Sequence, residues 1–150
     1  MTFLKSMDIS ASGLSAQRLR MDLISQNIAN ADTTRTENGQ PYRRKTALFE
    51  QRGSSSSFSS YLSESSKTKI GTSNINGVRV KRIIEDSSPF KRIHDPGHPD
   101  ADEAGYVLMP NVDTMTEMVN MISATRSYEA NVMAMNSTKA MAMKALEIGK

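Results

Sequence analysis

Apolar side chains recur at spacings of three and four residues throughout the C-terminal part of the chain, which is the period of an α-helix. Residues 111–148 contain neither proline nor glycine and are rich in good helix formers. Asp113 or Thr114 can cap the start, and Thr114 with Glu117 has the spacing of a capping box. The pattern therefore predicts a helix over residues 114–148, about 50 Å long at 1.5 Å per residue.

The N-terminal segment has a weaker helical pattern. Gly13 lowers its helix propensity by about 1 kcal/mol relative to alanine, so we expect the first turns to become ordered only in contact with another structure. We predict a helix of roughly 23 residues that leads into extended chain over residues 30–36. Its apolar side chains recur every seven residues, at Met7, Leu14, Met21 and Ile28.

The predicted C-terminal helix is apolar along two stripes. The first stripe comprises Met115, Met118, Ile122, Val132, Met143 and Leu146. The second comprises Met121, Ala124, Tyr128, Met135, Ala142 and Ala145. The shorter N-terminal helix can cover only part of such a surface, so we expect the remainder to contact other chains. Methionine suits contacts of this kind because its flexible side chain fits non-identical holes. The alternative is that both stripes form the core of a monomeric bundle.

The middle of the chain, residues 37–110, reads as a small β-rich insert. Residues 54–66 are mostly serine, which is typical of a linker. After the turn signal Asn76-Gly77, apolar side chains largely alternate with cations over residues 78–84, as in a short strand with one solvated face. Residues 70–75 can pair with that strand. Further strand candidates are residues 90–93 and 106–109.

These patterns together predict a mainly α protein. Residues 1–36 and 111–150 form a helical assembly domain, in which the N- and C-terminal helices pair in a coiled-coil-like manner. The β-rich insert of residues 37–110 projects from this domain.

Composition narrows the function further. The net charge is +3 and no part of the chain is strongly basic, which argues against nucleic-acid binding. There is no cysteine, so disulfides and thiolate chemistry are excluded. With two histidines and no glycine-rich phosphate loop, an enzyme has little support, and we expect no cofactor and no small-molecule substrate. No secretory signal and no transmembrane stretch is evident, so any export is expected to bypass the general secretory route.

Two polar clusters could be taken for functional sites. His94, His98 and three aspartates lie within residues 94–102, but the prolines and glycine among them prevent a helix that would align the histidines. We interpret this segment as a polar turn whose aspartates form the turn, not as a metal site. The basic residues around Tyr42, within residues 42–45, are expected to be solvated. Pairing with a neighbouring subunit is the second interpretation, and binding of nucleic acid or lipid is the third.

Both ends of the chain resemble the flagellar axial proteins, the family of rod, hook and hook-associated proteins. Residues 24–33, ISQNIANADT, look like the signature near the end of the family's first helix. Residues 117–131, EMVNMISATRSYEAN, are similar to its C-terminal helix. The resemblance is closest to the proximal rod members. It rests there on residues 9–21 (ISASGLSAQRLRM), 33–36 and 39–44 (TTRT, GQPYRR), 94–102 (HDPGHPDAD) and 105–113 (GYVLMPNVD).

The resemblance implies a structural subunit of the flagellar basal-body rod. Subunits would be exported unfolded through the flagellar type III apparatus, without a cleaved signal peptide, and would stack helically into the driveshaft that carries torque from motor to hook. Implied partners are the chain itself, other rod subunits, the basal-body adaptor, the membrane ring and the export apparatus. The alternatives are another axial subunit of the basal body or a soluble coiled-coil adaptor.

The pattern and the motifs also suggest which side chains lie at subunit interfaces. Asn27 and Asn30 either end the first helix or bond backbone groups of a neighbouring subunit. Arg126 and Glu129 either pair on the surface of one chain or contact another subunit, and the motif favours the second. The full set of predicted interface residues is Met7, Leu14, Met21, Asn27, Ile28, Asn30, Met115, Met118, Ile122, Arg126, Tyr128, Glu129, Asn131 and Met135.

Overall fold

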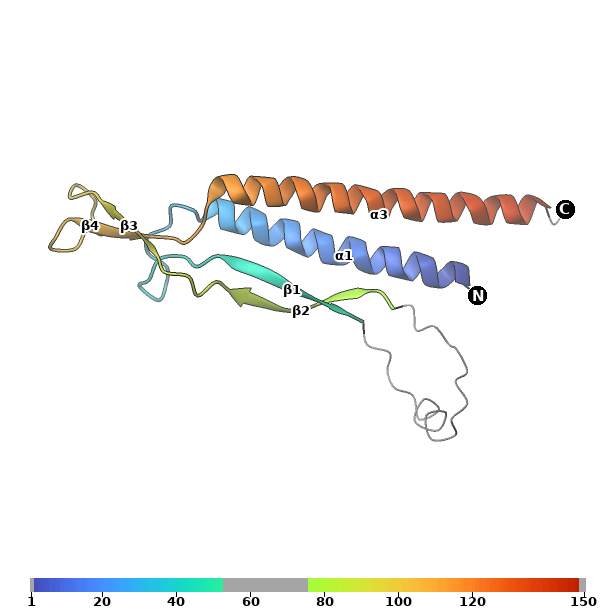
Figure 1. Cartoon of the computed structure of the whole chain (residues 1–150), viewed down its shortest axis with the longest axis horizontal. Coiled ribbons are helices and arrows are strands. Elements are labelled where there is room, and N and C mark those ends of the chain that lie inside the picture. The colour runs from blue at the N-terminus through green and yellow to red at the C-terminus, as the bar shows by residue number, and fades with distance from the viewer. Residues whose placement is uncertain (1, 53–75, 149–150) are drawn as a thin grey trace, which may run out of the picture.

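The structure is a computed structural model that describes residues 2–52 and 76–148. Two long helices lie side by side, and two antiparallel strand pairs extend along and beyond them (Figure 1). The elements are α1 (Thr2–Ala29), β1 (Lys45–Gln51), β2 (Val78–Glu85), β3 (Lys91–His94), β4 (Tyr106–Met109) and α3 (Thr114–Ile148). The predicted class, mainly α with a small β-rich insert, is confirmed.

The two helices run antiparallel and form the core between them. α3 has the predicted bounds, whereas α1 has 28 residues and is longer than expected. The longer α1 is explained by α3, which runs alongside it. A Cβ on Gly13 would lie only 2.9 Å from Oδ1 of Asn131, so the absence of a side chain at Gly13 lets the two helices approach closely. Within one chain, α3 is therefore the structure that α1 contacts at Gly13.

The structure separates the two apolar stripes of α3. Ala124, in the second stripe, is 0% exposed, and α1, which packs against α3, contributes the buried side chains Leu23 and Ile24. Met115 and Ile122, in the first stripe, are 72% and 54% exposed. Because α1 is a single helix, it covers one face of α3 and leaves the other uncovered.

β1 and β2 form a two-stranded antiparallel sheet that packs along α1 (Figure 1). β2 was predicted, but β1 was not. The register shifts between Leu48 and Phe49, so the alternation of inward and outward side chains along β1 is broken and its strand pattern is weak. The strand predicted over residues 70–75 and the serine-rich segment 54–66 lie outside the described residues.

β3 and β4 form a second antiparallel pair, which lies beyond the start of α3 and far from both termini (Figure 1). β4 has the predicted bounds, and β3 lies one residue later than predicted. No helix in residues 2–52 and 76–148 combines the length and apolar character needed to cross a membrane.

Candidate functional site

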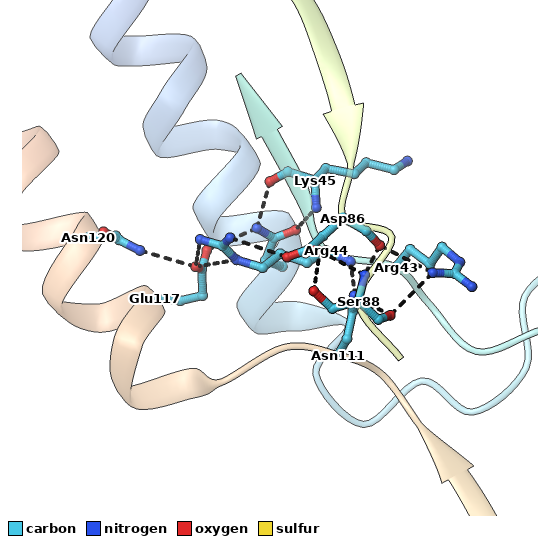
Figure 2. A network of polar contacts seen from close by, with 9 residues as sticks. Arg43, Arg44, Lys45, Asp86, Ser88, Asn111, Glu117 and Asn120 are labelled. Carbon is cyan, nitrogen blue, oxygen red and sulfur yellow. Dashed lines mark hydrogen bonds and ion pairs between the residues drawn. The ribbon is translucent and has the colours of Figure 1, made fainter. Parts of the chain in front are cut away.

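A buried carboxylate lies at the start of α3. The side chain of Glu117 is 1% exposed. Its Oε1 accepts hydrogen bonds from Nε and Nη2 of Arg44 at 3.0 and 2.8 Å (Figure 2). Its Oε2 accepts one from Nδ2 of Asn27 at 2.9 Å. A buried charge without such partners would be strongly destabilising. The carboxylate therefore joins α3 to the end of α1 and to the segment that enters β1.

The side-chain amide of Asn27 bonds both the backbone carbonyl and the backbone amide of Lys45, as the backbone of a neighbouring strand would. Its Nδ2 donates to the carbonyl of Lys45 at 2.9 Å, and its Oδ1 accepts from the amide of Lys45 at 2.9 Å and from the hydroxyl of Tyr42 at 3.1 Å. With the bond to Glu117, both donors and both acceptor positions of the amide are occupied. Asn27 was predicted to lie at a subunit interface; within one chain its side chain is 1% exposed and its amide is already fully hydrogen-bonded.

A second group of contacts extends the cluster to the segments that flank the strand pairs. The backbone amide of Arg44 donates to Oδ1 of Asn111 at 2.9 Å, and Nδ2 of Asn111 donates to the carbonyl of Asp86 at 3.1 Å. The carboxylate of Asp86 lies 3.8 Å from Arg44 (Figure 2). Hydrogen bonds from the side chain and backbone of Ser88 lower the pKa of Asp86, and the nearby arginines add to this effect. We call Asn27, Tyr42, Arg44, Asp86, Asn111 and Glu117 the polar cluster.

The basic segment at residues 42–45 was expected to be solvated, and the structure corrects this. Tyr42 is buried, and Arg44 is paired with Glu117. The guanidinium of Arg43 lies over the ring of Phe90, 4.3 Å from its centroid. Burial raises the pKa of the Tyr42 phenol, and the negative charges of Glu85 and Glu117 raise it further.

The helix start also differs from the predicted capping box. Thr116 donates its hydroxyl hydrogen to Oδ2 of Asp113, and the carbonyl of Asp113 accepts from the amide of Glu117 at 2.9 Å. Asp113 is therefore the capping residue, which confirms one of the two candidates, Asp113 and Thr114. The hydrogen bond from Thr116 lowers the pKa of Asp113. The carboxylate of Glu117 does not serve a capping box with Thr114, because Arg44 and Asn27 occupy it.

The sequence analysis did not identify Arg44 and Glu117 as partners. They are 73 residues apart in the chain, and their pairing depends on the antiparallel packing of the helices. One signal was available: Glu117 precedes Met121 and Ala124 at helical spacing, which places a carboxylate on the stripe that faces α1. An acid on a buried face requires a cation or several hydrogen-bond donors nearby.

A second candidate site is the exposed face of α3. We call this the α3 outer face, and its members are Met115, Met118, Val119, Ile122, Arg126, Glu129 and Met133, all of which are exposed. The predicted surface pair of Arg126 with Glu129 is not present, and neither side chain forms an ion pair with any described residue. The face is thus apolar apart from two unpaired charges of opposite sign.

The other predicted interface residues lie between the helices or near their ends, partly exposed. Nδ2 of Asn30 donates to the carbonyl of Gln26 at 2.9 Å, which fits the simpler expectation of a helix terminus. The hydroxyl of Thr125 donates to the sulfur of Met21 at 3.7 Å. The full set with intermediate exposure is Met7, Leu14, Met21, Ile28, Asn30, Tyr128, Asn131 and Met135.

Residues 95–105 connect β3 and β4 and contain most of the polar segment 94–102. Oδ1 of Asp95 accepts from the amide of Gly97 at 3.1 Å, and Oδ1 of Asp102 accepts from the amides of Ala104 and Tyr106 at 3.0 and 2.8 Å. The expected role as turn formers is confirmed for Asp95 and Asp102, whereas the carboxylate of Asp100 accepts from the hydroxyl of Thr34 at 2.8 Å and pairs with Arg35 at 2.9 Å. Within residues 2–52 and 76–148, no three His, Asp or Glu side chains are grouped so as to hold a metal ion.

Comparisons with known proteins agree with this architecture. Residues 7–35 match a family model described as flagella basal body rod protein, and residues 103–148 match one described as flagellar basal body rod FlgEFG protein C-terminal. The chain is 54% identical to the flagellar basal-body rod protein FlgC of Bacillus subtilis over 155 aligned positions that span both chains completely. It is 44% identical to the FlgC of Borreliella burgdorferi, covering 99% of this chain and 98% of that one. It is 39% identical to the FlgC of Escherichia coli O157:H7 over the whole of both chains.

Proposed function

The chain belongs to the family of the flagellar basal-body rod protein FlgC and is a structural subunit of the rod, and from this premise we propose how it assembles. Residues 1–36 with 111–150 act as the assembly domain, in which α1 and α3 pair in a coiled-coil-like manner. Residues 37–110 form the small insert. The polar cluster supports this division because it holds the entry to β1 against both helices.

The assembly domain stacks helically with further copies and with other rod proteins, and the stack serves as the driveshaft that carries torque from motor to hook. One observation carries this proposal: α1 packs against α3, where Ala124 of the second stripe is 0% exposed, but the first stripe is largely exposed, with Met115 and Ile122 at 72% and 54%. An apolar ridge of this extent on a structural subunit fits burial against a neighbour. A contact between two different surfaces repeats without closing and so yields a filament.

The proposal extends to location and partners. We infer that the subunit is exported through the flagellar type III apparatus into the basal body. There it meets other rod subunits, the basal-body adaptor and the membrane ring. The lack of cysteine supports export as an unfolded chain, because no disulfide can form before or during passage. The FlgC relatives are rod proteins, and no catalytic role is proposed.

The experiment is complementation of a strain that lacks this chain, with hook formation as the readout. Loss of the chain is expected to abolish hooks, and the unaltered chain is expected to restore them. Ile122→Glu places a charge in the α3 outer face and is expected not to restore hooks, because the charge would have to be buried in the contact. Ser123→Glu adds the same charge at the neighbouring exposed position, beside the ridge, and is the control. Hooks formed with Ile122→Glu at normal frequency would contradict the proposal.

A further inference from the structure

α1 also has an exposed face with two opposite charges. Arg18 and Asp22 are both exposed and lie about one turn apart on the side of the helix that is turned away from α3. Neither side chain forms an ion pair within residues 2–52 and 76–148. Small exposed side chains flank the pair and would let another helix approach closely. We call the α1 outer face the set Ala11, Ser15, Arg18, Asp22, Ser25 and Ala29.

The α3 outer face sets a chemical requirement for whatever binds it. Arg126 and Glu129 lie in a ridge between Ile122 and Met133, so a partner that covers the apolar side chains also removes these charges from water. Charges buried without opposite charges are costly. The occupant must therefore place an anion against Arg126 and a cation against Glu129.

We propose that the α3 outer face of one copy binds the α1 outer face of a second copy that points the same way along the assembly. Arg126 then lies opposite Asp22, and Glu129 lies opposite Arg18. This inference rests on the proposed function, because subunits of a continuous rod share one direction. The inference goes beyond the proposed function because it names the surface that binds the α3 outer face, and it states which charged residues lie opposite each other.

The order of the charges along the two helices carries the inference. Because α1 and α3 are antiparallel within a chain, α1 of a similarly directed copy runs antiparallel to the α3 that it meets. Moving along α3 from Arg126 to Glu129 covers about 4.5 Å, and moving along α1 from Asp22 back to Arg18 covers about 6 Å. Both opposite-charge pairs can therefore form together. A copy pointing the other way would set Arg126 against Arg18, which is repulsive.

The contact is between two different surfaces, so each bound copy presents a free face for the next. Within one chain Met21 lies beside Thr125, and Gly13 lies beside Asn131, so Asp22 is level with about residues 122–124 of its own α3. Bringing Asp22 of a second copy level with Arg126 requires an axial displacement of about 3–6 Å. Successive copies would therefore climb along the axis as in a helical stack.

Cross-linking tests the register directly, since the natural chain has no cysteine. Cells producing Ser25→Cys and Ile122→Cys as two separate variants are expected to yield a disulfide-linked dimer in isolated basal bodies. These positions flank the proposed charge pairs and leave the charges intact. Because each chain carries one cysteine, the Ser25–Ile122 bond must join two copies. The control is Ser25→Cys with Glu103→Cys, which lies in the turn between β3 and β4 and is expected to give no dimer.

Two outcomes would overturn the contact. The first is recovery of both variants in basal bodies without a Ser25–Ile122 cross-link. The second is a cross-link between Ile122→Cys and Met133→Cys, which would indicate that two copies of α3 face each other. In either case the proposed function would stand, because the chain is still incorporated. Absence of the unaltered chain from basal bodies would instead contradict the proposed function.

A charge exchange separates pairing from a general effect on folding. Arg126→Glu is expected to lose motility, because it sets like charges against Asp22. Adding Asp22→Arg to the same chain restores the opposite signs at that pair and is expected to recover motility. A double variant no more motile than Arg126→Glu alone, at equal protein level, would contradict the pairing.

Discussion

Arg44 donates two hydrogen bonds from one guanidinium to a single carboxylate oxygen of Glu117, and the two residues are 73 positions apart in the sequence. The carboxylate is almost completely buried, whereas 27% of the arginine side chain is exposed. This pair connects the segment entering β1 with the first turns of α3. This ion pair, the amide of Asn27 and the bonds of Asn111 together hold the long helix against the insert.

Removal of Arg44 is expected to destabilise the chain more than removal of an exposed ion pair. Arg44→Met leaves the carboxylate of Glu117 buried with fewer donors, which costs about 3–5 kcal/mol. Urea unfolding measures the change in the free energy of unfolding. The control is Glu147→Ala, which removes the exposed partner of Lys144 at 2.8 Å and should change stability by less than about 1 kcal/mol. Equal effects of the two variants would show that the buried pair does not have the expected role.

The sequence predicted the parts of the fold that depend on local patterns. The bounds of α3 followed from helix formers and a capping residue, and β4 from a short apolar run. β1 could not be predicted because the register shift at Leu48 and Phe49 breaks its alternation. Its pairing with β2 also depends on chain segments that are not adjacent in sequence.

The polar cluster could not be predicted from sequence patterns, for a different reason. Its bonds join residues that are 15 to 90 positions apart, such as Tyr42 with Asn27 and Asn27 with Glu117. No periodicity relates such positions, and the motif at residues 24–33 placed Asn27 either at a helix end or at a subunit interface. An exposed apolar face on α3, in contrast, could be predicted, because α3 has two apolar stripes and the chain has only one other long helix to cover them.

Tyr42→Phe is expected to change how stability depends on pH in the alkaline range. Burial raises the folded-state pKa of Tyr42 above the ordinary value near 10, so the folded state holds the phenol proton more tightly than the unfolded state does. Its contribution is complete below pH 10 and is lost as pH rises through the folded-state pKa.

Thermal unfolding from pH 8 to 12 measures the Tyr42 effect. Tyr42→Phe should lose about 1 kcal/mol at pH 8, because the hydrogen bond to Asn27 is gone, and should then decline less steeply than the unaltered chain. Tyr106→Phe, at an exposed position, is the control and should keep the steep decline. Parallel curves for the unaltered chain and Tyr42→Phe above pH 10 would contradict the expectation.

Gly77→Ala is expected to loosen the strand pair from α1. A Cβ at this position would lie 2.1 Å from Oγ and 2.9 Å from Cβ of Ser12, so the backbone of one element must move. The same hydroxyl accepts a hydrogen bond from the amide of Val78 at 3.1 Å, which would be lost. The expected loss of stability is about 1–3 kcal/mol, measured by urea unfolding. Gly97→Ala meets only ordinary contacts and should be nearly neutral; a similar loss there would argue against the steric explanation.

Substitutions at Asp113 should separate its capping role from its charge. Hydrogen bonding to Thr116 lowers the folded-state pKa of Asp113, so its stabilising contribution is complete above the ordinary pKa near 3.9 and is lost as pH falls through the lower folded-state value. Asp113→Asn keeps a capping oxygen that does not titrate, and should show a smaller loss of helix content in acid by circular dichroism. Asp113→Ala should lower helix stability at every pH. If Asp113→Asn and the unaltered chain lost helix content equally as pH falls, titration of the Asp113 carboxylate would not contribute to helix stability.

Hydrogen exchange on dilute, unassembled chain should reveal a gradient of protection along α3. The first turns are held by Glu117 and by the buried Ala124, whereas Met141, Met143 and Leu146 in the last turns are 63%, 55% and 75% exposed. Few buried contacts mean a low free energy of local opening, so the last turns of α3 and the first turns of α1 should exchange early and become protected on assembly. The control is the same measurement on isolated basal bodies, where both ends should exchange slowly. Strong protection throughout residues 114–148 in the dilute chain would show that one copy orders its helices without neighbours, and would contradict the expectation that assembly is what stabilises the ends.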